Sequence, residues 1–223
     1  EYHLPGGFLQ LKEGKMSSRT GNIILGEQLL DQAHASVEEI MKDHEVQDRE
    51  KVMSTVADAA VKYAILKTHV SADTLFDMKE SVSLSGDSGP YLLYIVARIK
   101  SILRKADNAP HPPLHNPTHP PLNLRGGERR GYGGSAGRVM ISPSEHKLIL
   151  SLARFPEATA EAAQTYDPSR IAHYLFNLAQ TFNTFYNECP VLQAEDKNVR
   201  AFSLELIATV ATVMTKGVFF LGI

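Results

Sequence analysis

The sequence predicts a mainly α protein, with a helical bundle in its second half and connecting helices before it. Apolar residues recur every three to four positions through residues 26–106 and again through residues 141–223, which is the spacing of amphipathic helices. Between these regions, six of the twelve prolines fall within residues 108–121, and proline cannot continue a helix. A chain of 223 residues with 43% hydrophobic content can bury a sizeable core.

Four segments follow from these changes in composition. Residues 1–25 precede the first helical pattern, and residues 26–106 form a connecting helical region. Residues 107–140 are a low-complexity insertion, rich in proline, glycine and arginine, which we expect to be disordered. Residues 141–223 form the helical bundle.

Three helices are predicted in the connecting region. The first carries its apolar stripe through residues 29–41 and the second through residues 52–66. Asp48 is a plausible N-cap for the second helix, because its side chain can accept from the free N–H groups of a first turn. A third helix is expected over about residues 90–105.

The bundle is predicted to begin with two short helices. Ser142 is a capping residue, and Pro143 after it suits the first helical position, where the missing N–H costs nothing. Phe155 and Pro156 interrupt the pattern, and a second helix should follow over about residues 157–164.

A long helix is expected to start at Asp167 and Pro168 and to run to about Glu188. Its large apolar side chains recur at helical spacing, and such a stripe is more often part of a core than a platform for a ligand. The stripe comprises Tyr174, Leu178, Phe182 and Phe185.

The last helix is expected over about residues 197–220. Glu205 and Lys216 interrupt its apolar sequence, which indicates a core helix rather than a membrane span, so no membrane partner is expected. The single cysteine, Cys189, excludes an internal disulfide and suits a reducing compartment, although a reactive thiol is an alternative. No export signal is apparent, so we expect a cytoplasmic protein.

A short cationic and hydroxyl-rich stretch near the N-terminus suits the binding of a polyphosphate. Lysine and arginine supply charge, serine donates hydrogen bonds, and flanking glycines permit unusual backbone shapes. An ordinary solvated turn has a similar composition and is the alternative. The stretch comprises Lys15, Met16, Ser17, Ser18 and Arg19.

The string GKMSSRTGN, at residues 14–22, resembles the lysine-methionine-serine signature loop of class I aminoacyl-tRNA synthetases, in the form found in arginyl-tRNA synthetases. Residues 86–94, with Arg98 one turn later, resemble a block characteristic of the arginyl enzymes. Residues 167–192 resemble the helical anticodon-binding domain that ends these enzymes. The resemblance covers nearly the whole chain except about residues 107–140.

The resemblance implies an arginine–tRNA ligase that uses ATP with Mg²⁺ as a substrate and needs no permanent cofactor. Residues 1–25 would then end its catalytic domain, with Lys15 stabilising charge on the pyrophosphate and residues 15–19 binding ATP. The first half of the ATP site is missing, because no His-x-Gly-His string occurs. We therefore expect the C-terminal part of a longer, monomeric enzyme, inactive on its own, whose partners are arginine, ATP and tRNA(Arg).

Two residues near the end of the long helix are the preferred tRNA contacts. A surface tyrosine such as Tyr186 can stack on an unpaired anticodon base, while Asn187 can bond to a base edge. Arg170 and Arg200 are candidate phosphate contacts, although a solvated surface role suits each equally well.

Several alternatives remain open. His111, His115 and His119 have the spacing of metal ligands on a helix, but intervening prolines prevent the helix, so no metal site is expected. The arginine-glycine part of the insertion could contact RNA phosphates or have no defined role. The whole chain could be a free-standing RNA-binding module without catalysis. The cysteinyl enzyme shares the signature loop but should lack the block at residues 86–94, in which Leu93 replaces a usual glutamine.

Overall fold

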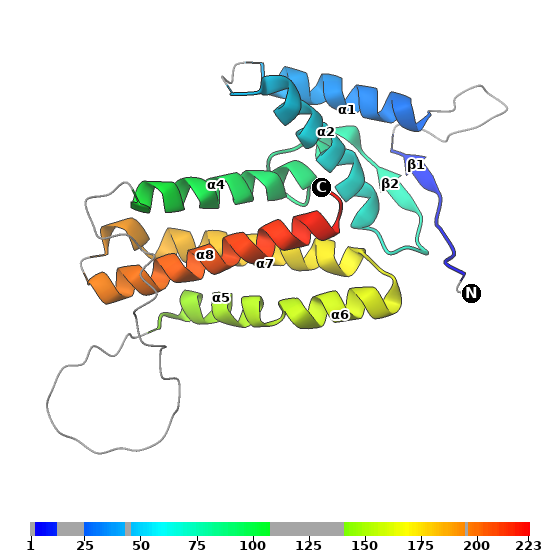
Figure 1. Cartoon of the computed structure of the whole chain (residues 1–223). Coiled ribbons are helices and arrows are strands. Elements are labelled where there is room, and N and C mark those ends of the chain that lie inside the picture. The colour runs from blue at the N-terminus through cyan, green and yellow to red at the C-terminus, as the bar shows by residue number, and fades with distance from the viewer. Residues whose placement is uncertain (1–2, 13–24, 43–45, 108–140, 195) are drawn as a thin grey trace, which may run out of the picture.

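The computed structural model describes residues 3–12, 25–42, 46–107, 141–194 and 196–223. Helices dominate these residues, which confirms the predicted mainly α class (Figure 1). The cationic stretch at residues 15–19 and the insertion at 108–140 lie outside them. The elements in chain order are β1 (Leu9–Leu11), α1 (Gly26–Ile40), α2 (Arg49–Leu66), β2 (Thr74–Phe76), α3 (Met78–Ser81), α4 (Gly89–Asp107), α5 (Pro143–Ala153), α6 (Phe155–Thr165), α7 (Ser169–Glu188), η1 (Val191–Gln193) and α8 (Lys197–Phe220).

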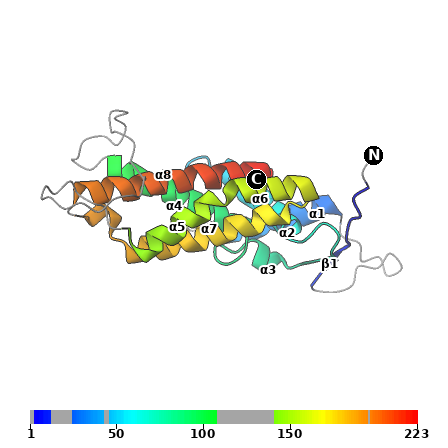
Figure 2. The same ribbon diagram turned by 90° about the horizontal axis from the view of Figure 1, so that it is seen from below.

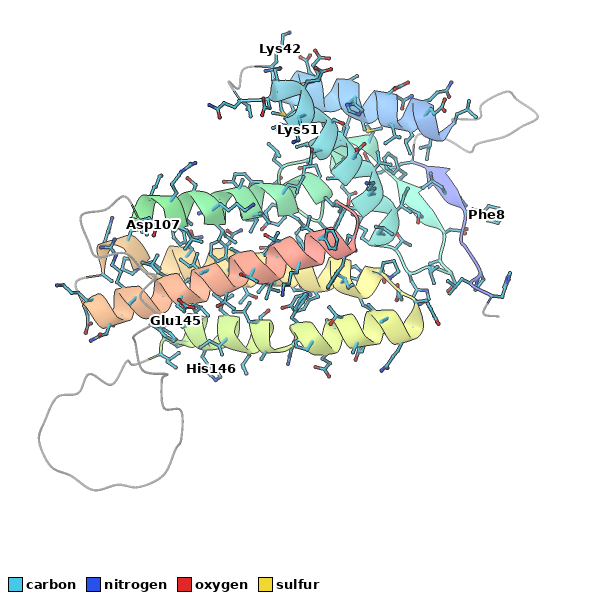
Figure 3. All side chains as sticks on the ribbon, in the orientation of Figure 1. Phe8, Lys42, Lys51, Asp107, Glu145 and His146 are labelled. Carbon is cyan, nitrogen blue, oxygen red and sulfur yellow. The ribbon has the colours of Figure 1, made fainter. Side chains whose placement is uncertain are left out.

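Helices α4 to α8 form the bundle. Figures 1 and 2 show them running roughly along one direction, with α1, α2 and β1 gathered at one end. Asp107 and Glu145, labelled in Figure 3, lie at the opposite end. Large apolar side chains from four helices are fully buried between them, including Ile95, Leu148, Phe182 and Ile207. The predicted stripe on α7 is confirmed as core, with Tyr174 half-buried at its margin.

A second hydrophobic cluster joins α1 and α2 to a small sheet. The sheet has two parallel strands, β1 and β2, with Leu9 opposite Thr74 and Leu11 opposite Phe76. These strands were not among the elements predicted from sequence. Each has three residues, too few to show an alternating pattern, and their pairing joins segments about 65 residues apart.

The predicted cap at Ser142 is confirmed, whereas α7 starts after Pro168 without a side-chain cap. The Ser142 hydroxyl accepts from the N–H of Glu145, and the Glu145 carboxylate accepts from the N–H of Ser142, so α5 begins with a capping box. The interpretation of Asp48 was wrong in its chemistry. Asp48 does precede α2, but its φ of 51° is left-handed and its side chain makes no capping hydrogen bond.

Helix α8 is long and apolar enough to cross a membrane by length and composition alone. In the structure, Leu204, Ile207 and Met214 on this helix are buried in the bundle core. Burial of this kind is expected of a core helix, which is what the two charged residues within its apolar sequence predicted.

Helices α2 and α4 cross closely at Gly89, the first residue of α4. A β-carbon built there would lie 2.1 Å from the carbonyl oxygen of Ala59, a backbone atom that cannot rotate away. Glycine at this position therefore allows the start of α4 to lie directly against the backbone of α2.

We predict that Gly89→Ala lowers the free energy of unfolding by about 1–3 kcal/mol, because the added carbon forces the two helices apart. Urea unfolding followed by circular dichroism measures this. The matched control is Gly26→Ala at the first residue of α1, where a β-carbon meets nothing within 4 Å. An equal loss of stability in both variants would argue against a close contact between α4 and α2 at Gly89.

Candidate nucleic-acid interface

Four side chains from α4 and α7 form one polar and aromatic cluster, named here the α4–α7 cluster: Tyr91, Arg98, Asn183 and Tyr186. The Arg98 guanidinium donates to the Asn183 side-chain oxygen at 3.0 Å. The Asn183 amide donates in turn to the Tyr91 hydroxyl at 2.9 Å. The Arg98 guanidinium also lies over the Tyr186 ring, 5.3 Å from its centre. One amide thus fixes the position of the cation relative to both tyrosines.

The cluster opens onto the protein surface. Tyr91 is buried, whereas Arg98, Asn183 and Tyr186 are half-buried. Tyr94 is 47% exposed and stands one turn before Arg98 on α4, and the exposed Asn187 stands one turn after Asn183 on α7. Aromatic rings, a guanidinium plane and amides therefore face solvent together.

The Tyr186 ring is supported from the core as well as by Arg98. It stacks on Phe182 with ring centres 6.0 Å apart and an angle of 24° between the planes. Because Arg98 already lies over Tyr186, an incoming base would stack on the guanidinium plane or displace it from the ring. The predicted base contact at Tyr186 would therefore involve Arg98 too.

Arg170 lies far from this cluster. It occupies the first turn of α7, about 24 Å along the helix axis from Tyr186 at 1.5 Å per residue. Its guanidinium forms ion pairs with Glu161 at 2.6 Å and with the buried Asp167 at 3.8 Å. A phosphate at Arg170 would compete with these two carboxylates.

Arg200 and Asn187 lie at the same end of the bundle as Tyr186. Asn187 is exposed in the last turn of α7, and Arg200 is half-buried in the first turn of α8. The structure thus brings three of the four candidate tRNA contacts to one end and leaves Arg170 at the other (Figure 1).

Sequence reasoning did not propose Arg98 or Asn183 as contacts. Their pairing joins helices separated by 85 residues, and nothing local in the sequence relates one helix face to the other. The available signal was the spacing of Tyr91, Tyr94 and Arg98, which share one face of α4.

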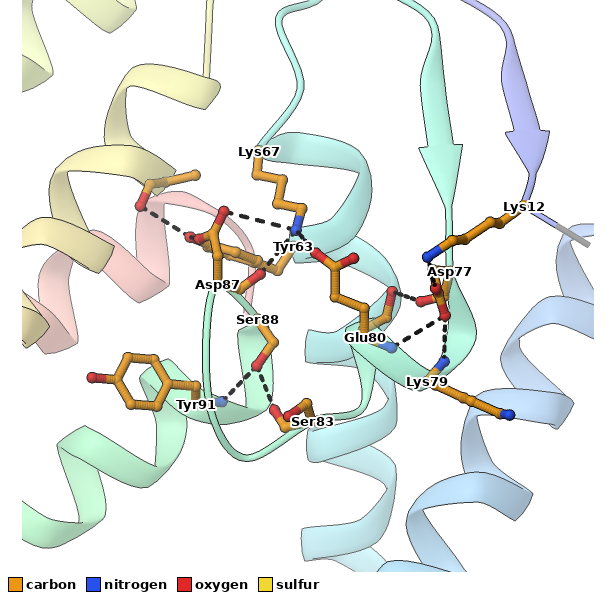
Figure 4. Close-up of polar contacts among 12 residues, drawn as sticks. Lys12, Tyr63, Lys67, Asp77, Lys79, Glu80, Ser83, Asp87, Ser88 and Tyr91 are labelled. Carbon is orange, nitrogen blue, oxygen red and sulfur yellow. Dashed lines mark hydrogen bonds and ion pairs between the residues drawn. The ribbon is translucent and has the colours of Figure 1, made fainter.

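The described residue nearest before the cationic stretch at residues 15–19 is Lys12, which bonds to residues 76 and 77. Lys12, just after β1, donates to the Asp77 carboxylate at 2.7 Å, and its N–H donates to the Phe76 carbonyl at 3.0 Å. Asp77 also accepts from the N–H groups of Lys79 and Glu80, which makes it the N-cap of α3. The hydrogen bond from Lys12, followed by the Glu80 N–H, holds the pKa of Asp77 below its usual value (Figure 4).

His111, His115 and His119 lie outside the described residues. Within the described ranges, no group of three or more histidine, cysteine or acidic side chains is placed to hold a metal ion. Cys189 is a free thiol, half-buried within 3.6 Å of the Ser142 and Ser144 hydroxyls.

Comparison with known proteins gives consistent matches. Residues 92–223 match the model of the DALR anticodon binding domain. An arginine–tRNA ligase of Treponema denticola is 35% identical over 96% of this chain and 34% of its own length, and one of Porphyromonas gingivalis is 33% identical over 99% and 35%. The solved Thermus thermophilus arginyl-tRNA synthetase is 29% identical with a TM-score of 0.76, over 98% of this chain and 34% of that one. The chain spans about a third of the length of these relatives.

We predict that Asn183→Ala lowers the free energy of unfolding by about 1–2 kcal/mol, because it leaves the buried Tyr91 and the half-buried Arg98 without their amide partner. Urea denaturation measures the change. Asn177→Ala, at an exposed position on the same helix, is the matched control and should stay within about 0.5 kcal/mol of the parent. Equal stability of both variants would mean that the amide does not organise the α4–α7 cluster.

Proposed function

The chain belongs to the DALR anticodon binding domain family, and from this membership we propose that it is part of an arginine–tRNA ligase, the enzyme that joins arginine to its tRNA with ATP. The observation that carries the proposal is similarity to ligases of this specificity over nearly the whole chain. The same similarity favours arginine over cysteine as the amino acid. Because the chain spans about a third of these relatives, catalysis is proposed for the complete ligase.

The bundle binds the anticodon arm through the α4–α7 cluster and the adjacent exposed side chains of Tyr94 and Asn187. Proteins read single-stranded RNA by stacking splayed bases on aromatic rings or guanidinium planes and by bonding to base edges. Tyr94 and Tyr186 supply rings, Arg98 supplies both a plane and donors, and Asn187 supplies an exposed amide. Because rings, a guanidinium plane and an amide lie in one place, the site is better suited to reading bases than to binding phosphates alone.

Phosphate attraction comes from local cations rather than from the charge of the whole chain. The formal net charge is −2, so no overall field draws the protein to RNA. Lys100, Arg104 and Lys105 are exposed on α4, toward the end of the helix that follows Arg98. Arg200 adds a cation at the same end, whereas Arg170 is a weaker candidate because of its ion pairs.

The segments have separate roles in this proposal. Residues 1–25 end the catalytic domain and carry the signature loop, in which residues 15–19 bind ATP with Mg²⁺ and Lys15 stabilises charge developing on the pyrophosphate. Residues 26–106 connect this loop to the anticodon-binding bundle, and residues 107–140 are an insertion. The complete ligase works as a monomer in the cytoplasm.

The function is tested by titrating the chain with arginine tRNA, an anticodon-altered version and an unrelated tRNA at several salt concentrations. Salt weakens phosphate contacts and leaves base readout largely intact, so preference for the arginine anticodon should persist at high salt. Equal, salt-sensitive binding of all three would contradict anticodon recognition.

Tyr186→Ala should weaken binding of arginine tRNA roughly 5- to 150-fold, because one stacked base is worth about 1–3 kcal/mol. Tyr186→Phe keeps the ring and should bind nearly as the parent does. Tyr166→Ala removes a ring that is 52% exposed on the opposite end of the bundle and is the matched control. Loss of affinity in the phenylalanine variant equal to that in the alanine variant would point to the hydroxyl rather than to stacking.

Lys15→Ala in the complete ligase should reduce ATP–pyrophosphate exchange by at least about tenfold, because an electrostatic contact made in the transition state is lost. Affinity for tRNA, measured by filter binding, should stay within about twofold, since that step does not use the pyrophosphate. A parallel loss of both activities would contradict the assigned role.

A further inference from the structure

Helix α2 belongs to both hydrophobic clusters. Ala57, Ala60 and Ala64 pack in the cluster with α1 and the small sheet, whereas Tyr63 is fully buried in the core of the bundle. The last turns of α2 are therefore the place where the part of the chain that carries the signature loop meets the part that carries the α4–α7 cluster.

Lys67, the residue after α2, bonds to both sides of this junction. Its ammonium donates to the Glu80 carboxylate on α3 at 2.9 Å and to the Asp87 carbonyl, just before α4, at 2.9 Å. The Asp87 carboxylate lies 3.7 Å from the same ammonium. The Lys67 side chain is only 22% exposed, so these bonds are partly shielded from water.

Tyr63 ties Asp87 to the bundle. Its hydroxyl lies 2.6 Å from the Asp87 carboxylate and 3.1 Å from the Ala172 carbonyl on α7, and it can donate its proton to either oxygen. Burial, and then the bond to Asp87, raise the pKa of Tyr63 well above its usual value, so the hydroxyl stays a donor at any physiological pH.

On the other side, Lys12 completes an uninterrupted line of contacts (Figure 4). Lys12 pairs with Asp77, Asp77 caps α3, and Glu80 on α3 pairs with Lys67. Lys12 directly precedes the residues that include the signature loop. The line therefore begins at the base of that loop and ends at the backbone of α7, the helix that carries Asn183 and Tyr186.

We propose that Lys67 is a positioning residue, which holds the base of the signature loop at a fixed place relative to the α4–α7 cluster through Glu80 on one side and Asp87 on the other. The consequence for catalysis rests on the proposed ligase function. Lys67 belongs to neither hydrophobic cluster, so both cores should still form without it. The shared burial of α2 keeps the two parts joined, and the loss of Lys67 should loosen the distance and angle between them.

The relation is measured by the distance between spin labels in the 223-residue chain. In a Cys189→Ser background, labels are attached at Glu38→Cys on α1 and at Thr212→Cys on α8, both exposed positions. Lys67→Met should broaden the distribution of distances, whereas Lys67→Arg keeps a cationic donor and should leave it narrow. Lys51→Met is the control, because Lys51 is exposed on α2, the helix that Lys67 follows, and forms no ion pair within the described residues. An unchanged distribution in Lys67→Met would overturn the proposal.

A second arm measures the consequence in the complete ligase. Lys67→Met should lower kcat for aminoacylation at least about tenfold, because small displacements of reacting groups have effects of this size. The KM for tRNA should stay within about twofold, and Lys67→Arg should recover most of kcat. An unchanged kcat, or a rise in KM alone, would overturn the positioning role. Absence of aminoacylation in the parent ligase would instead refute the proposed function, while the spin-label arm still tests the junction.

Discussion

The whole arrangement depends on the burial of one helix, α2, in two hydrophobic cores. Its alanines allow α1 to approach on one side, and its single large buried ring, Tyr63, enters the bundle on the other. Gly89 allows α4 to start directly against the α2 backbone at Ala59. Small residues at the crossing and one aromatic anchor are therefore what join the two halves into one body.

Most of the helices could be predicted from sequence, because their apolar spacing and capping residues are local. The cap at Ser142 and the core stripe on α7 are of this kind. The strands β1 and β2 were missed, since their pairing is a long-range event between segments without a pattern. Asp48 occupied the predicted place without capping, and its backbone there is left-handed rather than in the extended region that capping residues usually adopt.

The same distinction between local and long-range information applies to the candidate site. Tyr186 and Asn187 could be selected from one helix, but their relation to Arg98 depends on the packing of α4 against α7. The ion pair of Arg170 with Glu161 was equally hidden, because Glu161 belongs to a different helix and approaches only after the chain turns between α6 and α7. Sequence therefore identified residue types suited to RNA, and tertiary packing decided which of them lie together.

The composition of the α4–α7 cluster bears on how RNA would be discriminated. An ammonium held alone at a surface attracts any phosphate, and salt weakens that attraction uniformly. Arg98 is instead held by an amide and lies over a ring, so its plane has a fixed orientation before RNA arrives. A guanidinium plane with a fixed orientation favours a base that can stack parallel to it. It disfavours a base that remains paired within an RNA helix. Selectivity in this protein would then arise from a preorganised surface that accepts only an unpaired loop, with the nearby cations of α4 setting overall affinity.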